Sequence, residues 1–119
     1  MRVIVIVKAN EESEAGIMPS KQILTDMGKY NEELVKAGIM LDGEGLHPSS
    51  KGKRIKFQSG NRIVTDGPFA ETREQIGGYF LVDVKDLDEA LDIASRIPGA
   101  TIGTVEVRAV GEVEGLPDI

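Results

Sequence analysis

The hydrophobic and polar positions of the chain form different patterns along its length, each typical of a strand or of a helix. Residues 2–8 form an unbroken β-branched run between two charged ends, a pattern typical of a strand that is buried on both faces. Residues 79–84 have the same pattern, with Asp83 as a polar interruption. The two runs therefore predict two central strands of one sheet.

The segment after the first strand follows a helical period instead. Its apolar face consists of Ile23, Met27, Tyr30 and Leu34, with Leu24 and Val35 beside them. Side chains three and four residues apart share one face of a helix, so this spacing predicts a helix packed on the sheet. Either Pro19 or Ser20 begins it, and Gly38 ends it in a left-handed conformation.

A second helix is predicted between Asp86 and Pro98-Gly99. The Asp86 carboxylate is expected to accept hydrogen bonds from backbone N–H groups, with Glu89 in the reciprocal position of a capping box. The buried stripe consists of Leu87, Ala90, Leu91 and Ala94, followed by Ile97. Because proline cannot continue a helix, Pro98-Gly99 is expected to end it.

The remaining strands are shorter and more polar. Residues 39–41 predict a strand, and a glycine-rich turn over 42–48 leads the chain outward from it. Residues 54–58 and 61–65 alternate polar and apolar positions around Ser59-Gly60, which predicts a hairpin of half-exposed strands. The hairpin therefore separates the second strand from the third.

A last alternating strand places Val105, Val107 and Ala109 on one face. The order is thus strand, helix, strand, hairpin, strand, helix, strand. We predict a single domain over residues 1–119 in the α+β class, a ferredoxin-like βαβ(ββ)βαβ sandwich with an extra hairpin. The tail from about 111 to 119 is expected to be loosely held.

Both helices of such a layout cover the same face of the sheet. Since strands 2–8 and 79–84 are apolar toward both faces, the second face would leave an exposed apolar patch. A second copy of the same sheet is an economical cover for it. We therefore expect a homodimer with a twofold interface.

A compact motif joins the hairpin to the strand at 79–84. It runs Asp66-Gly67-Pro68-Phe69, then Glu71, Arg73-Glu74 and Gly77-Gly78. This motif resembles the signature of the DGPF proteins, a branch of the YCII-related family, and the resemblance is clearest over residues 28–84. It implies a dimeric α/β barrel formed by sheet-to-sheet packing. It also implies a histidine–aspartate active site, and some members of that family are assigned a dehydrochlorinase-like activity on a chlorinated aromatic.

His47 is the only histidine, and histidine is the side chain whose unperturbed pKa lies near neutrality. Its Gly-Leu-His-Pro setting matches the family, as Asp66 does through the motif itself. The resemblance implies a catalytic pair in which His47 is the general acid or base and Asp66 orients it. The residues alone leave two simpler alternatives open, a half-exposed loop histidine without a role and an Asx turn at Asp66.

Three further residues of the motif are candidates for substrate binding. Arg73 could hold a substrate carboxylate through two parallel hydrogen bonds, and Glu71 and Gly67 are the other two candidates. The expected ligand is therefore a small molecule with an anionic group. The alternative for Arg73 is a local ion pair, of the kind that contributes about 0–1 kcal/mol at a surface.

Charge and composition narrow the class of protein. The chain has 14 basic and 20 acidic residues and a net charge of −6, with the basic residues scattered, so we expect no binding to nucleic acid. The run Glu11, Glu12 and Glu14 is expected to be a solvated loop. The apolar run from Val3 to Val7 near the amino terminus is too short and wrongly flanked for a signal peptide or a membrane span. Because the chain also lacks cysteine, we expect a cytoplasmic protein.

No cofactor and no metal are expected. Asp42, Glu44 and His47 carry metal-binding groups, but their spacing matches no recognised site and the glycines between them explain the segment as a turn. The leading hypothesis is a cofactor-free small-molecule enzyme. The alternative is a non-catalytic metabolite-binding or regulatory module of the same fold, since DGPF proteins are often encoded beside sigma-factor-like regulators. A third possibility is a scaffold protein whose motif only makes a turn.

Overall fold

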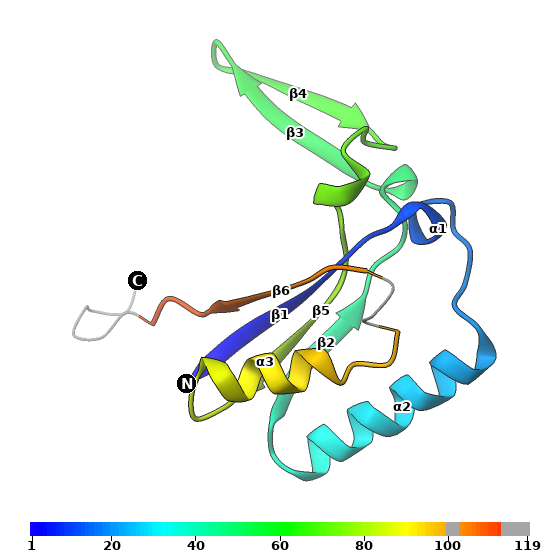
Figure 1. The fold of residues 1–119 in the computed structure, drawn as a ribbon. Coiled ribbons are helices and arrows are strands. Elements are labelled where there is room, and N and C mark those ends of the chain that lie inside the picture. Colours follow the sequence, from blue (N-terminus) through cyan, green and yellow to red (C-terminus); the bar gives the residue numbers. More distant parts are fainter. Residues whose placement is uncertain (100–102, 113–119) are drawn as a thin grey trace.

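The computed structural model describes residues 1–99 and 103–112, except for the side chain of Arg73. Its centre is a four-stranded antiparallel sheet in the order β2-β5-β1-β6. The strands are β1 (Arg2–Lys8), β2 (Met40–Gly45), β5 (Ile76–Asp83) and β6 (Val105–Ala109). Two helices, α2 (Lys21–Lys36) and α3 (Leu87–Ser95), cover one face of this sheet (Figure 1). The predicted α+β class is confirmed, and β1 and β5 are the central strands as expected.

A separate hairpin interrupts the chain between β2 and β5. It consists of β3 (Lys53–Gln58) and β4 (Asn61–Asp66), which form a two-stranded sheet of their own. The turn residues Ser59 and Gly60 have φ angles of 51° and 80°, the left-handed values that a two-residue hairpin turn requires. The predicted hairpin and its turn are therefore confirmed.

The hairpin differs from the prediction in its exposure. Every residue of β3 and β4 is exposed, where half-exposed strands were expected. Figure 1 shows the reason, since the hairpin projects away from the sheet and its two helices. The radius of gyration of 16.6 Å is larger than the value of about 13.5 Å expected for a compact chain of this length.

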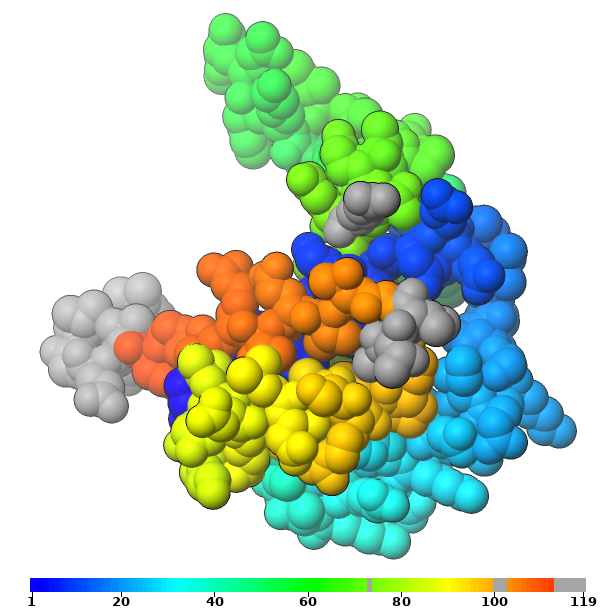
Figure 2. All heavy atoms as spheres, in the orientation of Figure 1, coloured from blue at the N-terminus to red at the C-terminus, as the bar shows by residue number. Residues whose placement is uncertain are grey.

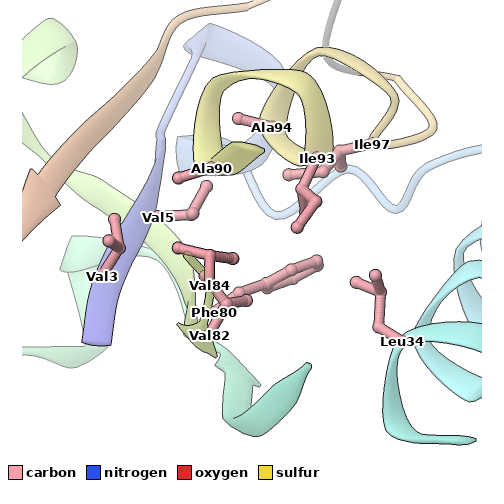
Figure 3. Packing of buried hydrophobic residues seen from close by; sticks show 10 residues of the cluster. All are labelled: Val3, Val5, Leu34, Phe80, Val82, Val84, Ala90, Ile93, Ala94 and Ile97. Atoms are coloured by element: carbon pink, nitrogen blue, oxygen red, sulfur yellow. The ribbon is translucent and has the colours of Figure 1, made fainter. Parts of the chain in front are cut away.

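The hydrophobic core lies between the sheet and the two helices. Val3 pairs with Val82 and Val5 with Phe80 across β1 and β5, and all four side chains are buried on the helix side. The helices cover them with Leu34, Ala90, Ile93 and Ala94, and Ile97 follows α3 (Figure 3). Burying a side chain such as valine or phenylalanine contributes about 1.5–3 kcal/mol, so these contacts hold the layers together.

The other face of the sheet carries a second set of apolar side chains. Ile4 pairs with Leu81 and Ile6 with Tyr79, and all four are half-buried. Because side chains alternate along a strand, these residues point away from α2 and α3. We call this surface the open face.

The ends of both long helices follow the expected chemistry, except that among the described hydrogen bonds the Glu89 side chain does not complete the predicted capping box. Ser20, rather than Pro19, caps α2, because its Oγ accepts a hydrogen bond from the N–H of Ile23 at 3.2 Å. Gly38 beyond the helix has a φ of +73°. At α3, the Asp86 carboxylate accepts from the N–H of Glu89 at 2.9 Å.

Two local predictions are wrong. Strand β2 continues to Gly45 through the segment expected to turn, with a bulge between Met40 and Asp42. The reason is close pairing with β5, since a Cβ added at Gly78 would lie 2.8 Å from the carbonyl oxygen of Glu44. Glycine at this position therefore permits a strand approach that a side chain would block.

The second wrong prediction concerns the acidic segment after β1. Helix α1 (Glu11–Glu14) replaces the expected solvated loop. The Asn10 Oδ1 accepts from the N–H of Ser13 at 2.8 Å, and the Ser13 Oγ accepts from the N–H of Asn10 at 2.9 Å. This capping box satisfies the first backbone donors, and acidic residues suit the positive end of a helix.

The last strand agrees with its predicted pattern. Residues Val105, Val107 and Ala109 lie opposite Val7, Val5 and Val3, on the helix side of the sheet. Beyond β6, the Glu112 carboxylate accepts from the Arg2 guanidinium at 2.7 Å. The loosely held tail was predicted for about 111–119. Glu112 is held by this ion pair, and residues 113–119 lie outside the described part of the chain.

Candidate functional site

The loop that contains His47 is fixed to the motif by Ser49. The Ser49 Oγ accepts a hydrogen bond from the N–H of Phe69 at 3.1 Å and donates one to the Glu14 carboxylate. The N–H of Ser49 also donates to the same carboxylate at 3.0 Å. One partly buried serine therefore joins α1, the loop after β2 and the motif after β4.

Gly67 completes this junction through its lack of a side chain. Its N–H donates to the carbonyl oxygen of Gly52 at 2.9 Å. A Cβ at Gly67 would lie only 1.7 Å from the carbonyl oxygen of Ser49, far inside contact distance. The geometry gives Gly67 a packing role between two loops, while the predicted contact to a substrate stays a prediction.

His47 and Asp66 lie on the two segments that Ser49 joins. Both are exposed. The Asp66 carboxylate accepts a hydrogen bond from the Lys53 Nζ, directly opposite it in the hairpin. Within the described residues, no hydrogen bond links His47 to Asp66, so their predicted action as a pair stays a prediction.

Glu71 has a partner that the sequence did not indicate. Its carboxylate lies 3.3 Å from the Arg54 guanidinium, which also stands 3.8 Å from the centroid of the Phe69 ring. A guanidinium over an aromatic ring is attracted by the electrons of the ring face. Arg54 therefore ties the base of the hairpin to the motif. The side chain of Arg73 lies outside the description, so its expected role in binding an anion stays a prediction.

A cavity of about 720 Å³ opens beside the motif. It lies between the end of β1 and the segment after Phe69, and its lining includes Lys8, Glu11, Glu71 and Glu74. This volume is within the range of small-molecule sites, about 300–1,000 Å³. Of the candidate residues, Glu71 lines this cavity, whereas His47 and Asp66 do not.

A second cavity of about 410 Å³ lies between the start of α2 and the segment after α3. Most of its side chains are apolar, among them Ile17, Met18, Ile23, Met27 and Ile97. It contains no candidate residue and lies on the helix side of the sheet. The first cavity is therefore the better candidate for a polar ligand.

A hydrogen bond on the open face changes the pKa of Tyr79. The Tyr79 hydroxyl donates to the Asp42 carboxylate at 2.9 Å. Because this hydrogen bond favours the neutral hydroxyl, it raises the pKa of Tyr79 above its ordinary value of 10.0. The sequence assigned Tyr79 to a strand, but only the pairing of β2 with β5 brings it to Asp42.

Neither a metal-binding cluster nor a membrane-spanning helix is found among the described residues. Over residues 1–99 and 103–112, no three histidine, aspartate or glutamate side chains are grouped closely enough to hold a metal ion. Over that same part of the chain, no helix has the length and apolar character needed to cross a membrane.

Sequence and structure together define a small α+β protein with one open sheet face, an inserted hairpin and a polar site beside the motif. The chain belongs to the YCII-related domain family, whose model matches residues 1–114. It is 37% identical over 90 residues to the uncharacterized protein R00369 of Rhizobium meliloti (strain 1021), covering 74% of this chain and 73% of that protein.

The fold is similar to that of a solved enzyme structure. The enzyme is TftG, the 5-chloro-2-hydroxyhydroquinone dehydrochlorinase of Burkholderia phenoliruptrix AC1100, in complex with 2,5-dihydroxybenzoquinone. The TM-score is 0.54 at 14% sequence identity, and the match covers 96% of this chain and 97% of TftG. At that identity the similarity concerns the fold.

Proposed function

We propose that this protein is a cofactor-free enzyme that moves a proton on a small organic molecule, with His47 as the general acid or base. The observation that supports this best is the anchoring of the His47 loop. Ser49 is held by Phe69 and Glu14, while His47, two residues earlier, remains exposed. A fixed loop with an accessible imidazole is what proton transfer to a bound molecule requires.

The role of Asp66 requires an exchange of partners. In the free chain its carboxylate is bound to Lys53. Both side chains are exposed, and such ion pairs contribute about 0–1 kcal/mol. A bound substrate can therefore displace Lys53 at little cost. Asp66 would then be free to orient His47, and the released ammonium would be free to face an anionic group of the substrate.

The proposed substrate is a small hydroxylated ring compound whose ionised hydroxyl supplies the anionic group. TftG, which shares the fold, is a dehydrochlorinase of a hydroxyhydroquinone and was solved with a dihydroxybenzoquinone. Compounds of this class lose a proton easily, so a neutral imidazole is a suitable acceptor. Arg73 and Glu71 are proposed to bind the remaining polar groups, as their place in the motif suggests.

The test uses chlorinated hydroxyhydroquinones as substrates and follows chloride release and absorbance. His47→Gln should lower kcat by about 10²–10⁴-fold, the usual contribution of a general acid or base, and Asp66→Asn should lower it in the same direction. Asp88→Asn, which removes an exposed carboxylate on α3, is the control and should leave kcat unchanged. Full turnover by His47→Gln would contradict the proposal.

A pH titration of the imidazole tests the pair directly. With a single histidine in the chain, the NMR signal of the ring has one possible origin. A different titration midpoint in wild type and Asp66→Asn is expected if the two side chains interact. If wild type and Asp66→Asn gave identical titration curves, both with and without 2,5-dihydroxybenzoquinone, the proposed interaction of Asp66 with His47 would be contradicted.

The second candidate is a non-catalytic metabolite-binding or regulatory module. The observation that favours it is the bond of Asp66 to Lys53 rather than to His47. Such a module would be stabilised against heat by 2,5-dihydroxybenzoquinone and would release the compound unchanged. Turnover of a chlorinated hydroxyhydroquinone by the wild-type chain, with loss of that turnover in His47→Gln, would favour the enzyme over the binding module.

We also propose that the active form is a cytoplasmic homodimer joined through the open face. The half-buried positions of Ile4, Ile6, Tyr79 and Leu81 support this, since an apolar sheet face is stabilised by a second layer. Two copies related by a twofold axis would form the dimeric α/β barrel that the family resemblance implies. Sedimentation analysis at several protein concentrations tests the stoichiometry.

A further inference from the structure

The projecting hairpin has two chemically different faces. We call residues 53–66, which comprise β3, its turn and β4, the arm. Ile55 lies opposite Val64, and Phe57 lies opposite Arg62, so these four share one face of the arm. The apolar members of this face are 58% (Ile55), 72% (Phe57) and 45% (Val64) exposed. The other face is mostly polar and has Ile63 opposite Lys56.

A hairpin of this kind is stabilised when another surface packs against it. Isolated two-stranded hairpins are marginally stable in water, yet every strand residue of the arm is exposed (Figure 2). The ion pair of Lys53 with Asp66 closes the base of the arm, and the ion pair of Arg54 with Glu71 joins that base to the motif. The arm projects from the sheet (Figure 1), so its apolar face has no packing partner among the described residues of its own chain.

The surface area of the chain indicates how large that contact is. The accessible surface is 8686 Å², roughly 2,400 Å² more than the value expected for a compact monomer of this mass. Obligate dimers bury about 1,000–2,500 Å² on each subunit. The excess of the whole chain is therefore of the size that a stable dimer buries on each subunit.

Charge indicates which molecule covers the arm. The arm carries Lys53, Arg54, Lys56 and Arg62 against the single acid Asp66, a net charge of +3, whereas the rest of the chain has a net charge of −9. A second copy of the chain therefore presents a surface of opposite sign. It includes Asp42 and Glu44, which lie on the open face beside Tyr79.

We infer that the apolar face of the arm packs against the second subunit of a homodimer, so that the arm of each subunit contacts the other subunit. This inference rests on the proposed dimer, because it assumes that a second copy is already held at the open face. The arm leaves the chain between β2 and β5, two strands of that face. An arm that leaves the end of the open face is placed to extend over a partner bound there.

The arm offers a matched pair of substitutions for the test. Ile55→Ser and Ile63→Ser remove the same side chain from opposite faces of the same hairpin. The measurement is the dimer dissociation constant, obtained by sedimentation over a dilution series. Ile55→Ser and Phe57→Ser should each raise it at least about tenfold, as expected at an interface centre, and Ile63→Ser less than about twofold. Melting followed by circular dichroism confirms that each variant is folded.

The outcomes separate this inference from the proposed dimer. The arm contact is overturned if Ile55→Ser and Ile63→Ser change the dissociation constant equally. It is also overturned if neither changes the dissociation constant while Ile4→Lys on the open face weakens association. In both cases the proposed dimer stands. If the wild-type chain is a monomer at every concentration, both are overturned. If a labelled single-stranded oligonucleotide binds, and Phe57→Ser abolishes that binding without changing association, the cover is a nucleic acid and the inference is wrong.

A crosslink gives a positive test that does not depend on affinity. Since the chain lacks cysteine, Arg62→Cys on the apolar face and Gln58→Cys on the polar face each provide one attachment point for a photoreactive maleimide. Covalent dimer should form in high yield from Arg62→Cys and in low yield from Gln58→Cys. Equal yields, or crosslinks within one chain alone, would overturn the contact.

Discussion

The hydroxyl of Ser49 accepts a hydrogen bond from the N–H of Phe69 at 3.1 Å, joining the loop of His47 to the turn that follows Asp66. Neither residue was a candidate for chemistry in the sequence. The contact turns two separate motifs into one unit, and the carboxylate of Glu14 extends it to α1. The position of the only imidazole therefore depends on a serine and a glutamate outside the motif.

Removing this hydroxyl should loosen the site. Ser49→Ala leaves the N–H of Phe69 without its hydroxyl partner and removes one of the two hydrogen bonds to the Glu14 carboxylate, and a partly buried polar group left unpaired costs about 1–3 kcal/mol. We expect a loss of free energy of unfolding in that range, measured by urea denaturation. Ser50→Ala, at the exposed neighbouring serine, should change it by less than about 0.5 kcal/mol. Equal effects of the two substitutions would contradict the role of Ser49.

Gly67 and Gly28 should respond to alanine in opposite directions. A Cβ at Gly67 would lie 1.7 Å from the carbonyl oxygen of Ser49, so Gly67→Ala must separate the two loops and should destabilise the chain by at least about 2 kcal/mol. Gly28 lies in α2 with no atom near the added methyl group. Gly28→Ala should therefore stabilise the chain by about 0.5–1 kcal/mol. Thermal melting of both variants measures the difference, and stabilisation by Gly67→Ala would refute the packing.

Titration of tyrosine at alkaline pH should reveal the contact of Tyr79 with Asp42. The hydrogen bond raises the pKa of Tyr79 above 10.0, so the contact stabilises the fold below about pH 10 and is lost as pH rises through the folded value. The chain has two tyrosines and no tryptophan, so Tyr30→Phe leaves one phenol to follow by ultraviolet absorbance. In that background Asp42→Asn should lower the pKa of Tyr79 toward 10. An unchanged titration curve would show that the hydrogen bond is absent.

The cap of α3 gives a prediction about stability alone. The Asp86 carboxylate accepts from the N–H of Glu89 at 2.9 Å. Asp86→Ala should cost about 0.5–2 kcal/mol, whereas Asp86→Asn, which keeps an acceptor oxygen, should cost much less. Urea denaturation of the two variants separates the hydrogen bond from the size of the side chain. A loss in Asp86→Asn as large as in Asp86→Ala would mean that charge, and not capping, is responsible.

Local chemistry explains which elements could be predicted. The unbroken apolar runs in β1 and β5, the helical spacing from Ile23 to Leu34 and the turn at Ser59-Gly60 are each encoded by neighbouring residues. One error arose where tertiary pairing prevailed, and the other from a local capping contact that was overlooked. Gly43 and Gly45 indicated a turn, but β5 provided backbone partners that continue β2 through both of them. The acidic run after Asn10 became a helix because Ser13 completes a capping box.

The sequence by itself determined the α+β class, the order of strands and helices, and the family to which the motif belongs, because periodicity and motif spacing are local properties of the chain. Tertiary structure alone decided that Ser49 fixes the loop of His47 and that the hairpin projects as an arm. Each of these depends on segments distant in sequence, or on the direction in which an element leaves the core. The physical reason is that such contacts follow from packing, which no local pattern specifies.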